Sequence, residues 1–146
     1  MASLTSKEKR YARILALQGI YAYEISGSDP KTTYKHMLDD TVVLKKQVID
    51  YGKKLCDLTI DKVESIDGFI KNKSRNWDLN RIALIDKLIL RMSLSEMLYI
   101  EEVPPKVSIT EGVEIAKEFS TNDSSSFVNG ILDSIYNDLM KGEIKI

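Results

Sequence analysis

Apolar residues recur at intervals of three and four along most of the 146-residue chain, and no stretch of strand length alternates strictly between apolar and polar residues. The first segment opens with Thr5-Ser6-Lys7-Glu8, a capping-box pattern in which the two end residues satisfy early backbone N–H groups. Gly27 is a suitable stop for this helix. The apolar positions between them follow helical spacing: Tyr11, Ile14, Leu15, Tyr21 and Ile25.

The next third of the chain predicts further helices. Asp29-Pro30 favours a short helix or ordered loop through about Leu38, because proline suits the first helical position. Asp40 is a candidate cap for a third helix, whose register breaks near Asp57. The apolar positions of that helix are Val43, Leu44, Val48, Tyr51, Leu55 and Cys56. Another helix carries Val63, Ile66, Phe69 and Ile70, and a polar loop is expected at 72–76.

A dense apolar segment predicts a central helix from about Asn80 to Ile100. A helix that is apolar on most faces is usually buried on most faces. Pro104-Pro105 is expected to end it. A second capping box, Ser108-Ile109-Thr110-Glu111, then predicts a helix start. The inward positions expected on that helix are Val113, Ala116 and Phe119.

The most polar loop of the chain is expected at 120–126, before a last helix. One face of that helix is apolar and comprises Phe127, Val128, Ile131, Leu132, Ile135, Tyr136 and Leu139. With helical periodicity throughout and no internal repeat, the predicted fold class is all-α, a compact bundle of about six to seven helices.

Composition narrows the class of protein. The chain is 43% hydrophobic, which is typical of a globular domain, and no apolar run is long enough for a transmembrane helix or a signal peptide. A single cysteine and a single histidine exclude an internal disulfide and a two-histidine zinc site. We therefore expect a soluble, cytoplasmic, single-domain protein without cofactor or metal.

Catalysis is not indicated. His36 stands among Lys35, Met37 and Asp39 without a nucleophile nearby, and Cys56 lies on an apolar stripe as a buried, inert thiol. The sequence contains neither of the glycine-rich nucleotide-binding motifs G-x-x-x-x-G-K-[ST] and G-x-G-x-x-G. The adjacent carboxylates Asp39-Asp40 and Glu101-Glu102 point apart on a helix and do not form a shared acid/base site.

Nucleic-acid binding has more support. The net charge is only −1, but Lys7, Lys9, Arg10 and Arg13 outnumber Glu8 within the first thirteen residues. This cluster is either a phosphate contact or a solvated helix face. Gln18, on the first helical stripe, is either satisfied inside or faces a ligand.

The start of the last helix offers a second candidate site. Asp123 and Ser124 lie where unpaired backbone N–H groups at a helix start attract phosphate. The alternative is that one of these two residues caps the helix. Phe127 is placed either to stack on an unpaired base or to pack in the core.

Three motifs together resemble the NusB family. They are Arg10-Tyr11-Ala12-Arg13 with Ala16-Leu17-Gln18, then Pro105 through Lys117, which reads PKVSITEGVEIAK, and Phe127 through Asp133, which reads FVNGILD. The spacing of Asp86, Arg91 and Glu96 agrees as well. The resemblance covers about residues 9–136, with 26–72 too variable to weigh.

The resemblance implies two packed helical subdomains, about 1–76 and 77–140. It also implies a transcription antitermination factor that binds single-stranded boxA RNA of ribosomal RNA leaders together with NusE, a small-subunit ribosomal protein. The complex would act on the RNA polymerase elongation complex with other Nus factors, and the protein itself would be a monomer or a homodimer. The RNA-binding residues that the resemblance implies are Lys9, Arg10, Arg13, Tyr21, Asp86, Lys87, Asp123 and Phe127, and the residue pattern adds Gln18 and Ser124 as candidates.

The chain departs from the family pattern in places, and two other functions remain open. Glu8 and Tyr11 dilute the basic segment, and Gly112 and Thr110 replace the usual alanine and asparagine. One alternative is a helical protein-interaction module without RNA activity of its own. The other is the NusB-like domain of a ribosomal RNA methyltransferase, for which we expect the 146 residues to be too few.

Overall fold

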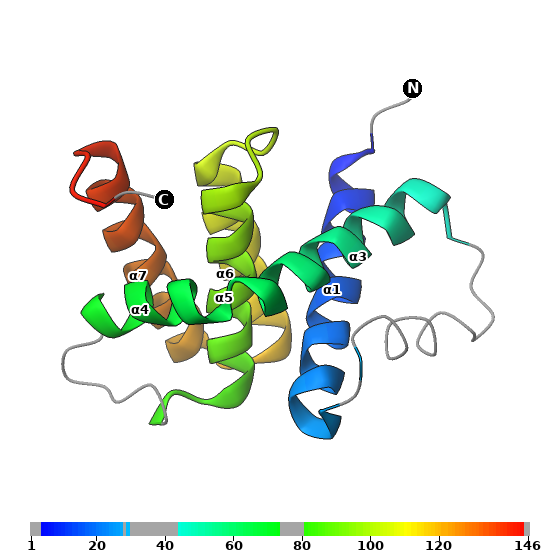
Figure 1. The fold of residues 1–146 in the computed structure, drawn as a ribbon, viewed down its shortest axis with the longest axis horizontal. Helices are drawn as coiled ribbons and strands as arrows, with labels where there is room; N and C mark the ends of the chain where they lie inside the picture. The colour runs from blue at the N-terminus through cyan, green and yellow to red at the C-terminus, as the bar shows by residue number, and fades with distance from the viewer. Residues whose placement is uncertain (1–3, 28, 30–43, 74–80, 145–146) are drawn as a thin grey trace. The chain divides into compact units, whose positions relative to one another are not determined.

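The computed structural model describes residues 4–27, 29, 44–73 and 81–144, which contain six α-helices and no strand (Figure 1). The helices are α1 (Ser6–Ser26), α3 (Lys46–Asp61), α4 (Val63–Lys73), α5 (Leu84–Tyr99), α6 (Pro105–Phe119) and α7 (Asn122–Met140). The all-α prediction is confirmed. The short helix expected from Pro30 to Leu38, the cap at Asp40 and His36 lie outside the described residues.

The chain divides into two compact units, residues 1–61 and 62–146. The helix α4 packs with α5 and α7 and therefore belongs to the second unit. The division thus falls at the turn around Lys62, one helix earlier than the predicted limit near 76. No helix within the described ranges is long and apolar enough to cross a membrane.

In the first unit α1 packs against α3 around a small apolar core. Its buried members are Ala12, Leu15 and Val48, and the partly buried residues against them are Leu4, Leu44, Ile49 and Tyr51. The helix α3 begins at Lys46, so Leu44 precedes it instead of lying on it as expected. The predicted break near Asp57 is wrong, because Leu55, Cys56 and Thr59 stay buried on one face and the helix continues to Asp61.

The start and stop signals of α1 are confirmed. Glu8 N–H donates to Thr5 Oγ1 at 3.1 Å, and Thr5 N–H donates to Glu8 Oε1 at 2.9 Å. Gly27 ends the helix with φ of 69°, a left-handed conformation that glycine adopts without steric cost.

The residues that the sequence places at helical spacing on α1 do not all face its core. Tyr11, Tyr21 and Ile25 are exposed, and the buried face is made mainly by small and aliphatic residues. These residues are Ala12, Leu15, Ala16, Leu17, Gly19 and Ile20. Of the spaced apolar positions, Leu15 lies in the core, whereas Tyr11, Tyr21 and Ile25 lie outside it.

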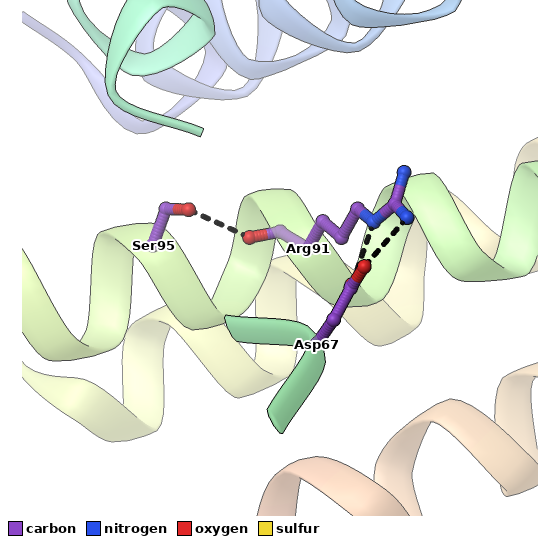
Figure 2. A network of polar contacts seen from close by, with 3 residues as sticks. All are labelled: Asp67, Arg91 and Ser95. Carbon is purple, nitrogen blue, oxygen red and sulfur yellow. Dashed lines mark hydrogen bonds and ion pairs between the residues drawn. The ribbon is translucent and has the colours of Figure 1, made fainter. Parts of the chain in front are cut away.

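The second unit is built on α5, which is buried along most of its length as predicted. It starts at Leu84 instead of near Asn80, and α4, α6 and α7 all pack against it. Arg91 on α5 donates to both carboxylate oxygens of Asp67 on α4, at 2.8 and 2.9 Å (Figure 2). Ser95 Oγ donates to the Arg91 carbonyl at 2.8 Å, which satisfies the buried hydroxyl within the helix.

The helix α4 is also tied to α7. Lys73, its last residue, forms an ion pair with Asp138, and this pairing lowers the pKa of the Asp138 carboxyl. The prediction of a loop from Asn72 is wrong at its first two positions, because Asn72 and Lys73 are still helical. The remainder of that loop, 74–76, lies outside the described residues.

The two consecutive prolines open a helix where the sequence predicted an end. The helix α5 already ends at Tyr99, and α6 starts at Pro105, where the missing backbone N–H has no cost. The predicted capping box at Ser108 is therefore wrong. Ser108 lies inside α6, and its Oγ donates to Glu96 Oε1 of α5 at 2.8 Å in the buried contact between the two helices.

The inward face of α6 is also shifted from the prediction. Ala116 is buried as expected, but Phe119 is 43% exposed and Val113 is only half-buried. Gly112 is buried instead, and a Cβ at this position would lie 2.4 Å from Ser93 Oγ of α5. The close approach of α5 and α6 explains why glycine stands there.

Candidate nucleic-acid interface

The starts of α5 and α7 in the second unit form a pocket of about 340 Å³. It is lined by Arg81, Ile82, Ala83, Asp86, Asp123, Ser124 and Phe127. Four of the predicted RNA-binding residues, Asp86, Asp123, Ser124 and Phe127, therefore lie together, although almost forty residues of chain separate the first from the others. The volume is within the range of small-molecule sites, which begins at roughly 300 Å³.

The α7 side of the pocket is fixed by a cap that the sequence analysis missed. Thr121 is the N-cap, and its Oγ1 accepts a hydrogen bond from Ser124 N–H at 3.1 Å and donates one to Ser124 Oγ at 2.9 Å. The polar segment predicted as a loop to 126 is thus helical from Asn122, and the alternative of Asp123 or Ser124 as the cap is wrong. Asp123 is exposed in the first turn, with its carboxylate available to a ligand.

The α5 side of the pocket carries a buried carboxylate. Asp86 lies in the first turn of α5 and is 5% exposed, and Ala83 at the N-cap provides no side-chain hydrogen bond. Its Oδ1 accepts no hydrogen bond from the described part of the chain. Since buried acceptors are almost always paired, this carboxylate is suited to a donor that a ligand brings.

Phe127 provides the aromatic wall. It is half-buried, whereas its neighbour Val128 and the following Ile131, Leu132 and Ile135 fill the core of the second unit. The interpretation of Phe127 as a full core residue is therefore wrong, because part of its surface faces the pocket.

Arg81 is a pocket residue that the sequence analysis did not select as a candidate. It is exposed and contributes the only cation of the described pocket lining. Lys87, which was selected, is half-buried and is not among the lining residues. Adjacent helix positions point about 100° apart, which explains why Asp86 and its neighbour do not share this wall.

The lining groups define what the pocket can hold. Two carboxylates accept hydrogen bonds, an aromatic side chain provides a stacking surface, and an arginine at the rim can contact an anion. The positive ends of α5 and α7 stabilise the carboxylates in their first turns. This set suits a planar, uncharged group with N–H donors that is attached to a phosphate.

The other predicted site residues lie on α1 in the first unit. Lys9 and Gln18 are exposed, Arg10 is half-buried, and Tyr21 is 42% exposed, but Arg13 is 3% exposed. The exposure of Gln18 removes the alternative in which its amide is satisfied inside the protein. Gln18 and Tyr21 are three residues apart and therefore share a face of the helix.

Other chemistry has little basis in the structure. Burial raises the pKa of the Cys56 thiol to about 12, so the thiolate needed for nucleophilic attack is not formed at neutral pH. Within the described ranges, no three carboxylate, histidine or cysteine side chains are grouped to hold a metal ion.

Comparison with known proteins gives a family and two close relatives. The model of the NusB family matches residues 10–137. The chain is 44% identical over 131 residues to the transcription antitermination protein NusB of Chloroherpeton thalassium, covering 90% of this chain but only 62% of that protein. It is 37% identical to the NusB protein of Salinibacter ruber, covering 90% of this chain and 82% of that one.

Solved structures share the fold. The NusB protein of T. maritima is 28% identical, with a TM-score of 0.82 and coverage of 99% of this chain and 100% of that one. A crystal structure of antitermination factors NusB and NusE in complex with double-stranded RNA matches with a TM-score of 0.81 at 23% identity, covering 91% of this chain and 98% of that chain.

Proposed function

Since the chain belongs to the NusB family, we propose that it is a transcription antitermination factor that binds single-stranded boxA RNA. The observation that carries this proposal is the pocket shared by Asp86, Asp123, Ser124 and Phe127. Single-stranded RNA is read by stacking its bases on aromatic side chains and by hydrogen bonds to their exposed edges. The pocket offers both kinds of contact.

Four of the pocket residues then have a role in holding one unpaired base and its phosphate. Phe127 stacks on the base, and the carboxylates of Asp86 and Asp123 accept from its amino and ring N–H groups. Arg81 contacts the adjoining phosphate. Lys9 and Arg10 of α1 contact other phosphates, and Gln18 and Tyr21 contact bases. RNA binding by Arg13 and Lys87 stays a prediction of the family resemblance.

The partners follow from the same family membership. We propose that NusE binds together with this protein and that the two act on the RNA polymerase elongation complex in the cytoplasm. The relative solved with NusE and RNA supports this partner. With a net charge of −1 and few exposed cations near the pocket, the protein alone is expected to bind RNA weakly and to gain affinity from NusE.

Titration of a labelled boxA RNA into the protein, with and without NusE, tests the proposed function. The proposal expects boxA to bind more tightly than a scrambled single strand and expects NusE to strengthen this binding. A protein that binds NusE but shows no RNA affinity in either setting would instead be a helical interaction module. That result would overturn the proposed function.

Changing Asp123 to asparagine tests base recognition. The substitution leaves the Thr121 cap in place but replaces a pure acceptor by a group that also donates. We expect the ratio of affinities for boxA and a base-substituted boxA to fall by about tenfold, because a hydrogen bond to a charged acceptor contributes roughly 1.5 kcal/mol or more.

The matched control for this change is Asp133→Asn, an exposed aspartate on the same helix outside the pocket. Both variants lose one negative charge, so any general electrostatic gain in RNA affinity is common to them. If the affinity ratio is the same in the two variants, Asp123 does not read a base.

A further inference from the structure

The first unit brings the starts of two helices together. Leu4 lies just before the N-cap of α1 and Leu44 just before α3, and both pack against the cluster of Ala12, Leu15 and Val48. Lys45 Nζ lies 2.7 Å from Glu8 Oε2, so the α3 start is also paired with the first turn of α1. Residues far apart in sequence therefore share one end of this unit.

This end of the first unit is rich in lysine. The stretches 4–10 and 44–46 contain five basic residues and a single acid, Glu8. Four of the basic residues are exposed, and we call them the helix-start patch: Lys7, Lys9, Lys45 and Lys46. The positive ends of α1 and α3 add to the field of these lysines.

The single acid in these stretches is already engaged. Glu8 accepts from the backbone of Thr5 and pairs with Lys45, and these hydrogen bonds lower its pKa to about 2. It is therefore ionised at neutral pH and offsets one lysine. The Lys45 side chain is 63% exposed even in this pair, so it can contact a second anion.

We propose that the helix-start patch binds RNA backbone phosphates, which extends the RNA-binding surface from α1 to the start of α3. This inference rests on the proposed function and adds Lys45 and Lys46, which neither the sequence analysis nor the family resemblance assigned. The chemistry favours phosphate over bases, because a lysine ammonium binds phosphate as a point charge and carries no sequence information. The patch therefore contributes affinity and salt dependence, not discrimination between sequences.

A pair of double variants on one helix tests the patch. Lys45→Gln with Lys46→Gln removes two patch charges, and Lys53→Gln with Lys54→Gln removes two exposed lysines farther along α3. We measure the dependence of the boxA affinity on salt concentration. For single strands the logarithmic slope changes by about 0.7 for each phosphate contact. The patch variant is expected to flatten the slope by about 1.4, with an equal loss of affinity for scrambled RNA, and the control is expected to keep the wild-type slope.

Two single variants keep the test independent of folding. Lys46→Gln leaves the pair of Glu8 and Lys45 intact and is expected to flatten the slope by about 0.7. Glu8→Gln retains an amide that can complete the capping box and releases Lys45, so it is expected to increase RNA affinity. The opposite signs of these two effects are not expected from a loss of stability.

The outcomes separate this inference from the function on which it rests. If the unaltered protein binds no RNA with or without NusE, the proposed function fails and the patch inference fails with it. If the unaltered protein binds boxA but the Lys45/Lys46 and Lys53/Lys54 variants have the same salt slope, the patch is not a phosphate site and the proposed function stands.

Discussion

Replacing Arg91 by methionine is expected to lower the free energy of unfolding by about 3 kcal/mol, because it leaves the Asp67 carboxylate without its two-pronged partner in a mostly buried place. The two side chains are only 10% and 18% exposed. Methionine retains most of the apolar contact of the arginine stem, so the loss reports mainly on the uncompensated charge. Urea unfolding of the two proteins measures it.

The control for this change is Lys117→Met, which breaks the pair with Glu114 on the surface of α6. Both partners are at least 40% exposed, and such a pair contributes at most about half a kcal/mol. A similar loss in the two variants would show that the contact between α4 and α5 does not depend on the ion pair of Figure 2.

Replacing Phe127 by alanine is expected to weaken boxA binding by about 5- to 150-fold, corresponding to ~1–3 kcal/mol for one stacked base. Phe127 is half-buried, so the variant also loses some stability, but less than the ~3–5 kcal/mol of a full core phenylalanine. Measuring the RNA affinity and the urea midpoint of the same variant separates the two effects.

Phe119→Ala provides the matched aromatic control. Phe119 is 43% exposed at the end of α6 and is not part of the pocket lining. We expect its removal to leave the boxA affinity within about twofold of the original. The stacking role is excluded if the two phenylalanine variants bind boxA equally well.

The helices were predictable from the apolar periodicity, but the residue at which a helix begins depended on whether a capping box or a proline starts it. Thr5 and Glu8 form a true capping box, whereas the same pattern at Ser108 is interior to α6 because Pro105 can begin a helix without a cap. Along that helix, the contact with α5 determines which face is buried, and the pattern of a single helix contains no information about this contact. This explains the exposure of Phe119 and the burial of Gly112.

The candidate RNA site was less predictable from the sequence than the helices were. The periodicity of the chain offered only competing roles for Asp123 and Phe127, and the family resemblance added Asp86. That these residues share a pocket depends on the packing of α5 and α7, which local sequence does not encode. Arg81 was not selected because nothing in the local sequence places it at the pocket rim, and Lys45 and Lys46 were not selected because they lie in a variable segment.

The central claim is that an unpaired base of boxA RNA occupies the pocket at the starts of α5 and α7. Backbone amide chemical shifts, recorded by NMR as boxA RNA is added, test it most directly because they report on each segment separately. We predict that the largest changes occur at residues 81–86 and 123–127, in addition to changes on α1. Unchanged shifts in both of these segments at saturating boxA RNA would contradict the claim.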